Sequence, residues 1–154
     1  MKTSEIMLGD YFNVHPSNLP IKVAAIHRGK VGYHACTDKL AWIMVDLIRP
    51  IPITPEVLAR MGFTIEEVPK YYDTYTEDEY TATIKCVDIR KCEVEIEYKT
   101  YWKKLRAFNY DPHNRLGFTS IETQVEYVHE LQHILKVMKV DKELELLKER
   151  RSNQ

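Results

Sequence analysis

Two histidines one helical turn apart, with a glutamate beside the first, are the residues of this chain best suited to chemistry. Residues 129–133 read His-Glu-Leu-Gln-His. On a helix this spacing brings both imidazoles to one side, where they can ligate zinc while the glutamate acts as general base on a metal-bound water. The pattern alone therefore predicts a zinc-dependent hydrolase with His129 and His133 as metal ligands and Glu130 as the catalytic base.

The helix that must carry these residues turns them away from its apolar side. At about 100° per residue, the apolar stripe centres on Val128, Leu131 and Leu135, whereas both histidines point to the polar face. A catalytic zinc site also needs a third protein ligand, and the Gly and third His that usually follow His133 are absent. We interpret the pattern as two solvated histidines on an amphipathic helix and expect no cofactor. The zinc hydrolase stays as an alternative.

A second group of candidate residues combines aromatic rings with positive charges. Such a stretch can stack bases or apolar groups and neutralise phosphates, or it can be a strand whose aromatic residues pack inward. A tyrosine-rich segment, residues 71–75, is a further candidate surface because tyrosine combines apolar area with a hydroxyl group. The predicted ligand- or partner-binding residues are Tyr98, Tyr101, Trp102, Lys103, Lys104 and Arg106.

Composition excludes several classes of function. The 154 residues include 22 Lys and Arg against 23 Asp and Glu, so no overall field attracts nucleic acid or an anionic membrane. Nucleic-acid binding through residues 98–106 is therefore only an alternative. No Gly-rich phosphate loop or nucleophile elbow is present, which argues against NTPases, dehydrogenases and serine hydrolases. Three cysteines without paired spacing, and no apolar run of membrane length, favour a cytoplasmic protein that does not contact membranes.

Short runs rich in β-branched and aromatic residues dominate the first fifty residues and predict a small SH3-like β-barrel unit over residues 1–50. Residues 51–70 are expected to be a linker with one short helix from Pro55 to Met61, since Thr54 is a good N-cap and Gly62 a good stop. The strands expected in the barrel unit cover residues 11–14, 21–27, 30–35 and 41–48.

The second half of the chain predicts a three-stranded antiparallel sheet covered by a C-terminal amphipathic helix, within residues 71–147. Val94, Ile96 and Tyr98 alternate with charged residues and should form the buried face of the sheet. A stripe of apolar residues from Ile121 to Met138 predicts a helix over 121–139 that packs on this face. Residues 148–154 are expected to be a disordered tail. The fold class is α+β, in two parts or as one compact domain. The three strands are expected over residues 80–89, 93–101 and 102–110.

Three segments stand out in order along the chain: residues 4–11, residues 51–58 with 61–63, and residues 127–133. They resemble a family of small uncharacterised proteins from Bacteroides-type gut bacteria, their phages and mobile elements. Similar proteins show a Gly-Asp-aromatic start, a Pro-Ile-Pro helix entry and a Tyr-Val-His-x-Leu-Gln helix. The resemblance implies an intracellular accessory role, such as modulation of host defences. In that family the positions of Glu130 and His133 often carry Gln and Asn, which argues against a zinc role.

These observations favour a binding or interaction protein rather than an enzyme. Its expected role is to sequester a ligand or a partner, either a protein or a small molecule such as a nucleotide. The two alternatives are the zinc hydrolase at residues 129–133 and a nucleic-acid-binding module at residues 98–106.

Overall fold

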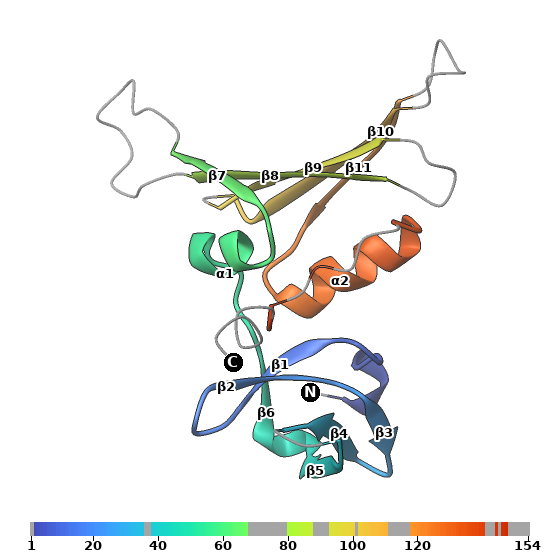
Figure 1. Ribbon diagram of the computed structural model, residues 1–154. Helices are drawn as coiled ribbons and strands as arrows, with labels where there is room; N and C mark the ends of the chain where they lie inside the picture. The colour runs from blue at the N-terminus through green and yellow to red at the C-terminus, as the bar shows by residue number, and fades with distance from the viewer. Residues whose placement is uncertain are drawn as a thin grey trace. The chain divides into compact units, whose positions relative to one another are not determined.

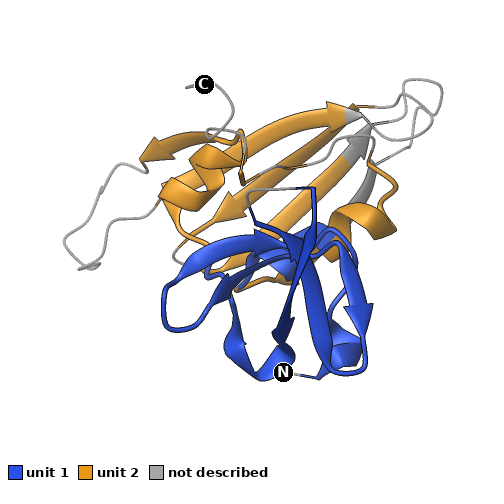
Figure 2. Cartoon of the chain, turned by 60° about the horizontal axis from the view of Figure 1, so that its bottom comes forward, with its two compact units in different colours: residues 1–52, 127–132 blue, residues 53–126, 133–154 orange. Residues whose placement is uncertain are grey.

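The computed structural model describes most of the chain and divides it into two compact units. Unit 1 comprises Met1–Pro52 and Tyr127–Gln132, and unit 2 comprises Ile53–Glu126 and His133–Gln154 (Figure 2). The chain is mixed α+β, as predicted. The described residues are 2–35, 38–67, 80–87, 93–100, 102–110, 118–140, 144, 146 and 147. Tyr101, the tyrosine-rich segment 71–75 and the predicted tail 148–154 lie outside them.

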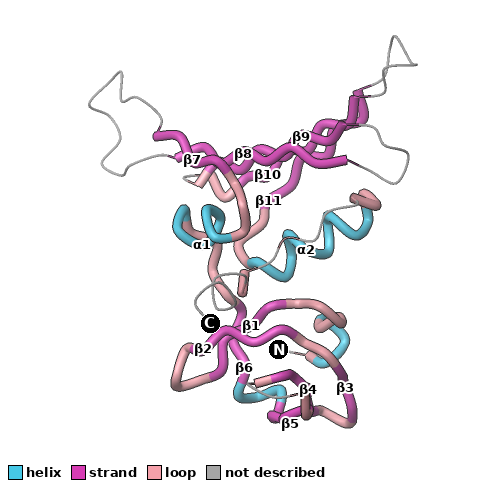
Figure 3. The backbone as a smooth tube through the Cα atoms, in the orientation of Figure 1, coloured by secondary structure: helices cyan, strands magenta, loops and turns pink. Residues whose placement is uncertain are grey.

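Unit 1 contains two three-stranded antiparallel sheets, in the orders β2-β1-β6 and β3-β4-β5 (Figure 3). The described strands form no closed barrel, and the SH3-like barrel stays a prediction. Two short 3-10 helices, η1 (Thr3–Glu5) and η2 (Val45–Leu47), accompany the strands. The strands are β1 (Tyr11–Val14), β2 (Leu19–Lys22), β3 (Ala25–His27), β4 (Lys30–His34), β5 (Leu40–Met44) and β6 (Ile48–Pro50).

Two strands predicted as continuous are each split where the chain passes between the two sheets. Between β2 and β3, the Val23 amide donates to Asp10 O (2.9 Å) beside one sheet, while the Ala24 amide donates to Gly32 O (2.8 Å) in the other. Between β5 and β6, the 3-10 helix η2 carries the chain from one sheet to the other. The prediction of single strands over 21–27 and 41–48 was therefore wrong, because apolar composition continues through both corners. The core of this unit contains Ile6, Phe12, Ile21, Val23, Val31, Val45 and Ile48.

Unit 2 is built on a five-stranded antiparallel sheet with the order β11-β10-β9-β8-β7, not the three strands predicted. The strand β7 was missed inside the predicted linker. Helix α1 (Pro55–Arg60) forms as predicted: Thr54 Oγ1 accepts from the Val57 amide (3.2 Å), and Gly62 has a φ of +96° just beyond the helix. The strands are β7 (Thr64–Glu67), β8 (Tyr80–Val87), β9 (Glu93–Lys99), β10 (Lys104–Tyr110) and β11 (Phe118–Gln124).

The long C-terminal helix predicted over residues 121–139 is shorter, because its first part is a strand. Helix α2 runs from Val128 to Val137, and Phe118–Gln124 forms β11, in which Ile121 pairs with Ala107 of β10. Threonine at 119 and 123 and isoleucine at 121 favour a strand with alternating faces, and long-range pairing with β10 decides the conformation. None of the helices in the described residues is long and apolar enough to span a membrane.

One face of the five-stranded sheet is apolar and buried, and we call the opposite face the outer face. Ile84, Val94, Ile96, Leu105 and Ala107 are at most 5% exposed. Helix α1 and the second half of α2 lie on that buried side (Figure 1). The outer face therefore carries the other residue of each alternating pair, and these residues supply the candidate site.

Candidate binding hollow on the sheet face

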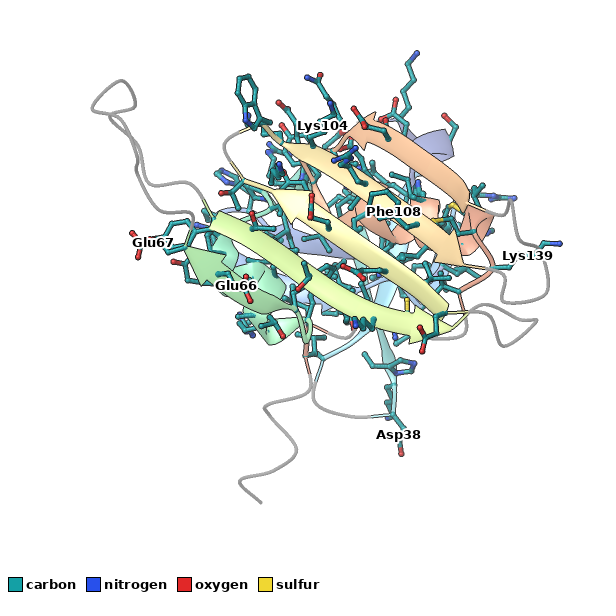
Figure 4. The ribbon with its side chains drawn as sticks, turned by 90° about the horizontal axis from the view of Figure 1, so that it is seen from above. Asp38, Glu66, Glu67, Lys104, Phe108 and Lys139 are labelled. Carbon is teal, nitrogen blue, oxygen red and sulfur yellow. The ribbon has the colours of Figure 1, made fainter. Side chains whose placement is uncertain are left out.

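The outer face of the sheet in unit 2 is polar and charged, and its side chains stand toward the viewer in Figure 4, where Lys104 and Phe108 are labelled. In β9, Glu93 and Glu95 are exposed, while Val94 and Ile96, which alternate with them, are buried. The alternation comes from the two-residue period of a strand, which sends successive side chains to opposite faces. The sequence predicted this division correctly for β9.

A hollow of about 710 Å³ lies at one end of the outer face. Three neighbouring strands position its walls: Lys104 of β10 pairs with Lys99 of β9 on one side and with Gln124 of β11 on the other. Two residues further along β10, Arg106 pairs with Glu122 of β11. The lining residues are Lys99, Trp102, Lys104, Arg106, Glu122, Thr123 and Gln124.

Trp102 reaches this hollow from the tight connection between β9 and β10. Its side chain is 54% exposed. The next residue, Lys103, has a left-handed backbone with a φ of +49°, and its carbonyl accepts from the Val125 amide (2.9 Å). The Lys103 ammonium forms an ion pair with Glu126 (3.0 Å). The connection is thus fastened to the segment after β11, which keeps the indole at the hollow.

Charge in the hollow is concentrated around one carboxylate. Glu122 forms ion pairs with both Lys104 and Arg106, the latter with Nε 3.2 Å from Oε2. The hydrogen bond from Lys104 lowers the pKa of the Glu122 carboxyl, and the charges of Lys104 and Arg106 add to the effect. Arg106 also lies over the Phe108 ring, 5.5 Å from its centroid. Three cations against one carboxylate leave the lining positive.

Removing Lys104 should return the Glu122 carboxyl toward its ordinary pKa. Because the folded-state pKa is lowered, the ion pairs contribute stability above the unfolded-state pKa, and this stability is lost as the pH falls through the folded-state value. Carboxyl-carbon NMR titration of the wild type and Lys104→Met checks this, and Lys85→Met on the same face is the matched control. Equal Glu122 titration in all three proteins would contradict the ion-pair description.

The structure brings together only some of the residues predicted for binding. Trp102, Lys104 and Arg106 line the hollow, and Lys103 lies beside it in its pair with Glu126. Tyr98 is 1% exposed on the buried face, where its hydroxyl donates to Val125 O (2.7 Å). This corrects its assignment to a binding surface. Tyr101 lies outside the described residues.

Sequence reasoning missed the wall supplied by β11. Glu122, Thr123 and Gln124 were placed on a helix, which would have carried them away from Lys104 and Arg106. The signal that could have found them is the recurrence of β-branched residues at every second position, Thr119, Ile121 and Thr123, which is typical of a strand. It is weak because Ile121 also fits the three-and-four spacing of the following helix.

Most residues of the His-Glu-Leu-Gln-His segment have structural roles in unit 1. The His129 ring packs 5.0 Å from Phe12 and 6.0 Å from Tyr127, centroid to centroid, and is 9% exposed. Glu130 Oε2 accepts from the Tyr127 amide (3.1 Å), which caps the first turn of α2. The prediction that both histidines are solvated was therefore wrong for His129. At the beginning of α2, His129 and Gln132 pack against β1, so these two positions are buried rather than solvated.

The donors that a metal would require are not grouped in the described part of the chain. Among those residues, no three His, Cys, Asp or Glu side chains lie close enough together to hold a metal ion. His133 is partly buried on α2. Within unit 1, His129 and Glu130 border a hollow of about 580 Å³ that also contains Glu5, Asp46 and Arg49. Arg49 there donates to the backbone oxygens of Asp46 (2.6 Å) and Ile48 (2.9 Å).

Comparison with known proteins identified no relative of this chain. No protein-family model, no curated protein and no solved structure matches this chain.

Proposed function

We propose that this chain is a binding protein that captures a small anionic ligand carrying a planar ring, of the nucleotide kind, in the hollow on the outer face of unit 2. One observation carries the proposal: Lys99, Lys104, Arg106 and an exposed Trp102 line the same hollow. Cations hold phosphate or carboxylate groups, and an indole offers a stacking surface worth about 1–3 kcal/mol per base. These groups hold a ligand rather than break its bonds.

The size of the hollow supports a compact ligand. Its volume of about 710 Å³ lies within the range of small-molecule sites, roughly 300–1,000 Å³. Glu122 forms ion pairs with both Lys104 and Arg106 at the hollow, and its negative charge competes with the ligand for them. An incoming anion would share these two cations with the Glu122 carboxylate.

The charges around the hollow favour a short anion over a long nucleic acid. A polynucleotide crossing the outer face would pass Glu66, Glu95 and Glu97, whose carboxylates repel phosphates. The whole chain has a net charge of −1 and supplies no compensating field. A mononucleotide or a similar ligand needs only the positive end of the face.

Titration calorimetry with ATP tests the proposal. We expect micromolar binding to the wild type, with about tenfold weaker binding by Trp102→Ala because the stacking surface is lost. The matched control is Trp42→Ala, which removes a similarly exposed indole (48%) from unit 1 and should leave the affinity unchanged. CTP should bind nearly as well as ATP, since stacking tolerates any base.

Two outcomes would refute the proposal. The first is no measurable heat with either nucleotide at millimolar concentration. The second is equal weakening by Trp102→Ala and Trp42→Ala when circular dichroism shows that both variants are folded, which would place the ligand elsewhere.

A further inference from the structure

Two lysines of the hollow lie directly opposite each other on neighbouring strands. Lys99 of β9 pairs with Lys104 of β10, and both line the hollow on the outer face, where Figure 4 labels Lys104. Side chains at such paired positions have Cβ atoms about 4.5–5.5 Å apart, and like charges placed there destabilise a sheet. The lysine pair therefore carries a repulsion that an anion between the two ammonium groups would remove.

Elsewhere on this face, the described strands place opposite charges together. The positions that flank the lysine pair across the sheet are uncharged, Thr81 of β8 and Gln124 of β11. One carboxylate reaches the pair from the next row, where Glu122 contacts Lys104 as well as Arg106. The row of the two lysines is thus short of negative charge. The pairs of opposite charge are Arg106 with Glu97, Arg106 with Glu122 and Lys85 with Glu95.

We propose that Lys99 and Lys104 together hold one dianionic phosphate, so that the ligand of the hollow is a compound with a terminal phosphate group. This inference rests on the proposed function and narrows its ligand. A terminal phosphate carries a charge of about −1.5 to −2 at pH 7 and has three acceptor oxygens. It can offer an oxygen and close to one charge to each ammonium group. When the phosphate takes Lys104, Glu122 keeps its ion pair with Arg106.

The same charges disfavour related anions. A phosphodiester, as in a cyclic nucleotide or within a nucleic-acid chain, carries a single negative charge, and so does a carboxylate. Neither can neutralise both lysines, and each must still compete with Glu122 for Lys104. Stacking on Trp102 contributes equally for ligands that share a base. The charge of the phosphate alone should therefore separate two such ligands.

Calorimetric titration with AMP and with 3′,5′-cyclic AMP tests the inference, because these ligands share base and sugar and differ in phosphate charge. We expect the wild type to bind AMP about tenfold more tightly than cyclic AMP. Lys99→Met should reduce this preference to about twofold. The matched control Lys85→Met, on the same face outside the hollow, should keep the full preference. Lys104→Met removes the other member of the pair and gives the same test if Lys99→Met fails to fold.

Measurable but equal affinity of the wild type for the two ligands would overturn the inference and leave the proposed function standing. A tenfold preference that persists in both Lys99→Met and Lys104→Met would also overturn it, because the charge would then be read elsewhere.

Inorganic phosphate tests the lysine pair without the ring. Thermal unfolding in sodium phosphate is compared with unfolding in sodium chloride at the same ionic strength. Phosphate raises the Tm of folded proteins generally because it is excluded from their surface. The inference predicts an additional rise in the wild type and Lys85→Met that is absent from Lys99→Met. That result without any nucleotide binding would refute the proposed function and support the lysine pair, whereas equal rises in all three proteins would overturn the inference.

Discussion

Replacing Gln132 with leucine should lower the free energy of unfolding by about 3 kcal/mol. The Gln132 side chain is 8% exposed and joins two backbone groups before and within β1. Its Oε1 accepts from the Tyr11 amide (3.0 Å), and its Nε2 donates to Gly9 O (3.0 Å). Leucine fills a similar volume but offers neither group. Because buried polar groups that lose a hydrogen bond cost about 1–3 kcal/mol each, the two losses together give the expected decrease.

Urea denaturation followed by tryptophan fluorescence measures this change. Lys136→Leu is the matched control, since it introduces the same residue at an exposed position of α2 and should change stability by less than about 0.5 kcal/mol. If Gln132→Leu cost less than about 1 kcal/mol, Gln132 would not be what fastens the beginning of α2 to β1 within unit 1.

The role of Gln132 changes how the His-Glu-Leu-Gln-His pattern is interpreted. Sequence spacing drew attention to the two histidines and the glutamate, which have metal-binding chemistry. In the structure, Glu130 caps the helix and His129 packs against Phe12, while Gln132 makes the longest-range contacts. A spacing rule identifies residues that share a helix face, but the partners that occupy that face come from segments more than a hundred residues away.

Local signals were enough to predict several elements. The N-cap Thr54 and the stop at Gly62 located α1 because both act within one helical turn. The turn at Arg28 and Gly29 has a positive φ at both residues, which is the geometry a two-residue hairpin requires, and it separates β3 from β4 as predicted. These features depend on neighbouring residues alone.

Other predictions failed because they depended on pairing between strands far apart in the sequence. Strand β11 has a helix-compatible spacing, and only its seven-residue pairing with β10 makes it a strand. The hollow could not be predicted without it, because Glu122 approaches Lys104 and Arg106 through that pairing. Tyr98 is different: its alternation with Val94 and Ile96 already placed it on the buried face, and its membership of an aromatic and basic stretch obscured this.

Removing cations from the hollow should weaken nucleotide binding, and removing its carboxylate should strengthen it. Replacing both Lys104 and Arg106 with alanine removes two of its three cations and leaves Glu122 unneutralised there. At about 1 kcal/mol for each half-exposed charge, we expect roughly thirtyfold weaker binding of ATP. Glu122→Gln removes the one carboxylate and releases both cations to the ligand, so it should tighten binding several-fold. Lys85→Ala, on the same face but outside the hollow, is the control.

Calorimetric titration of ATP into these four proteins, wild type included, at low ionic strength is the most direct test of the binding hollow. The proposal predicts weaker binding by the Lys104 and Arg106 double variant, tighter binding by Glu122→Gln, and wild-type affinity for Lys85→Ala. Both effects should shrink as salt is added, because exposed charges are screened. Equal affinity in all four proteins, or weaker binding by Glu122→Gln, would contradict it.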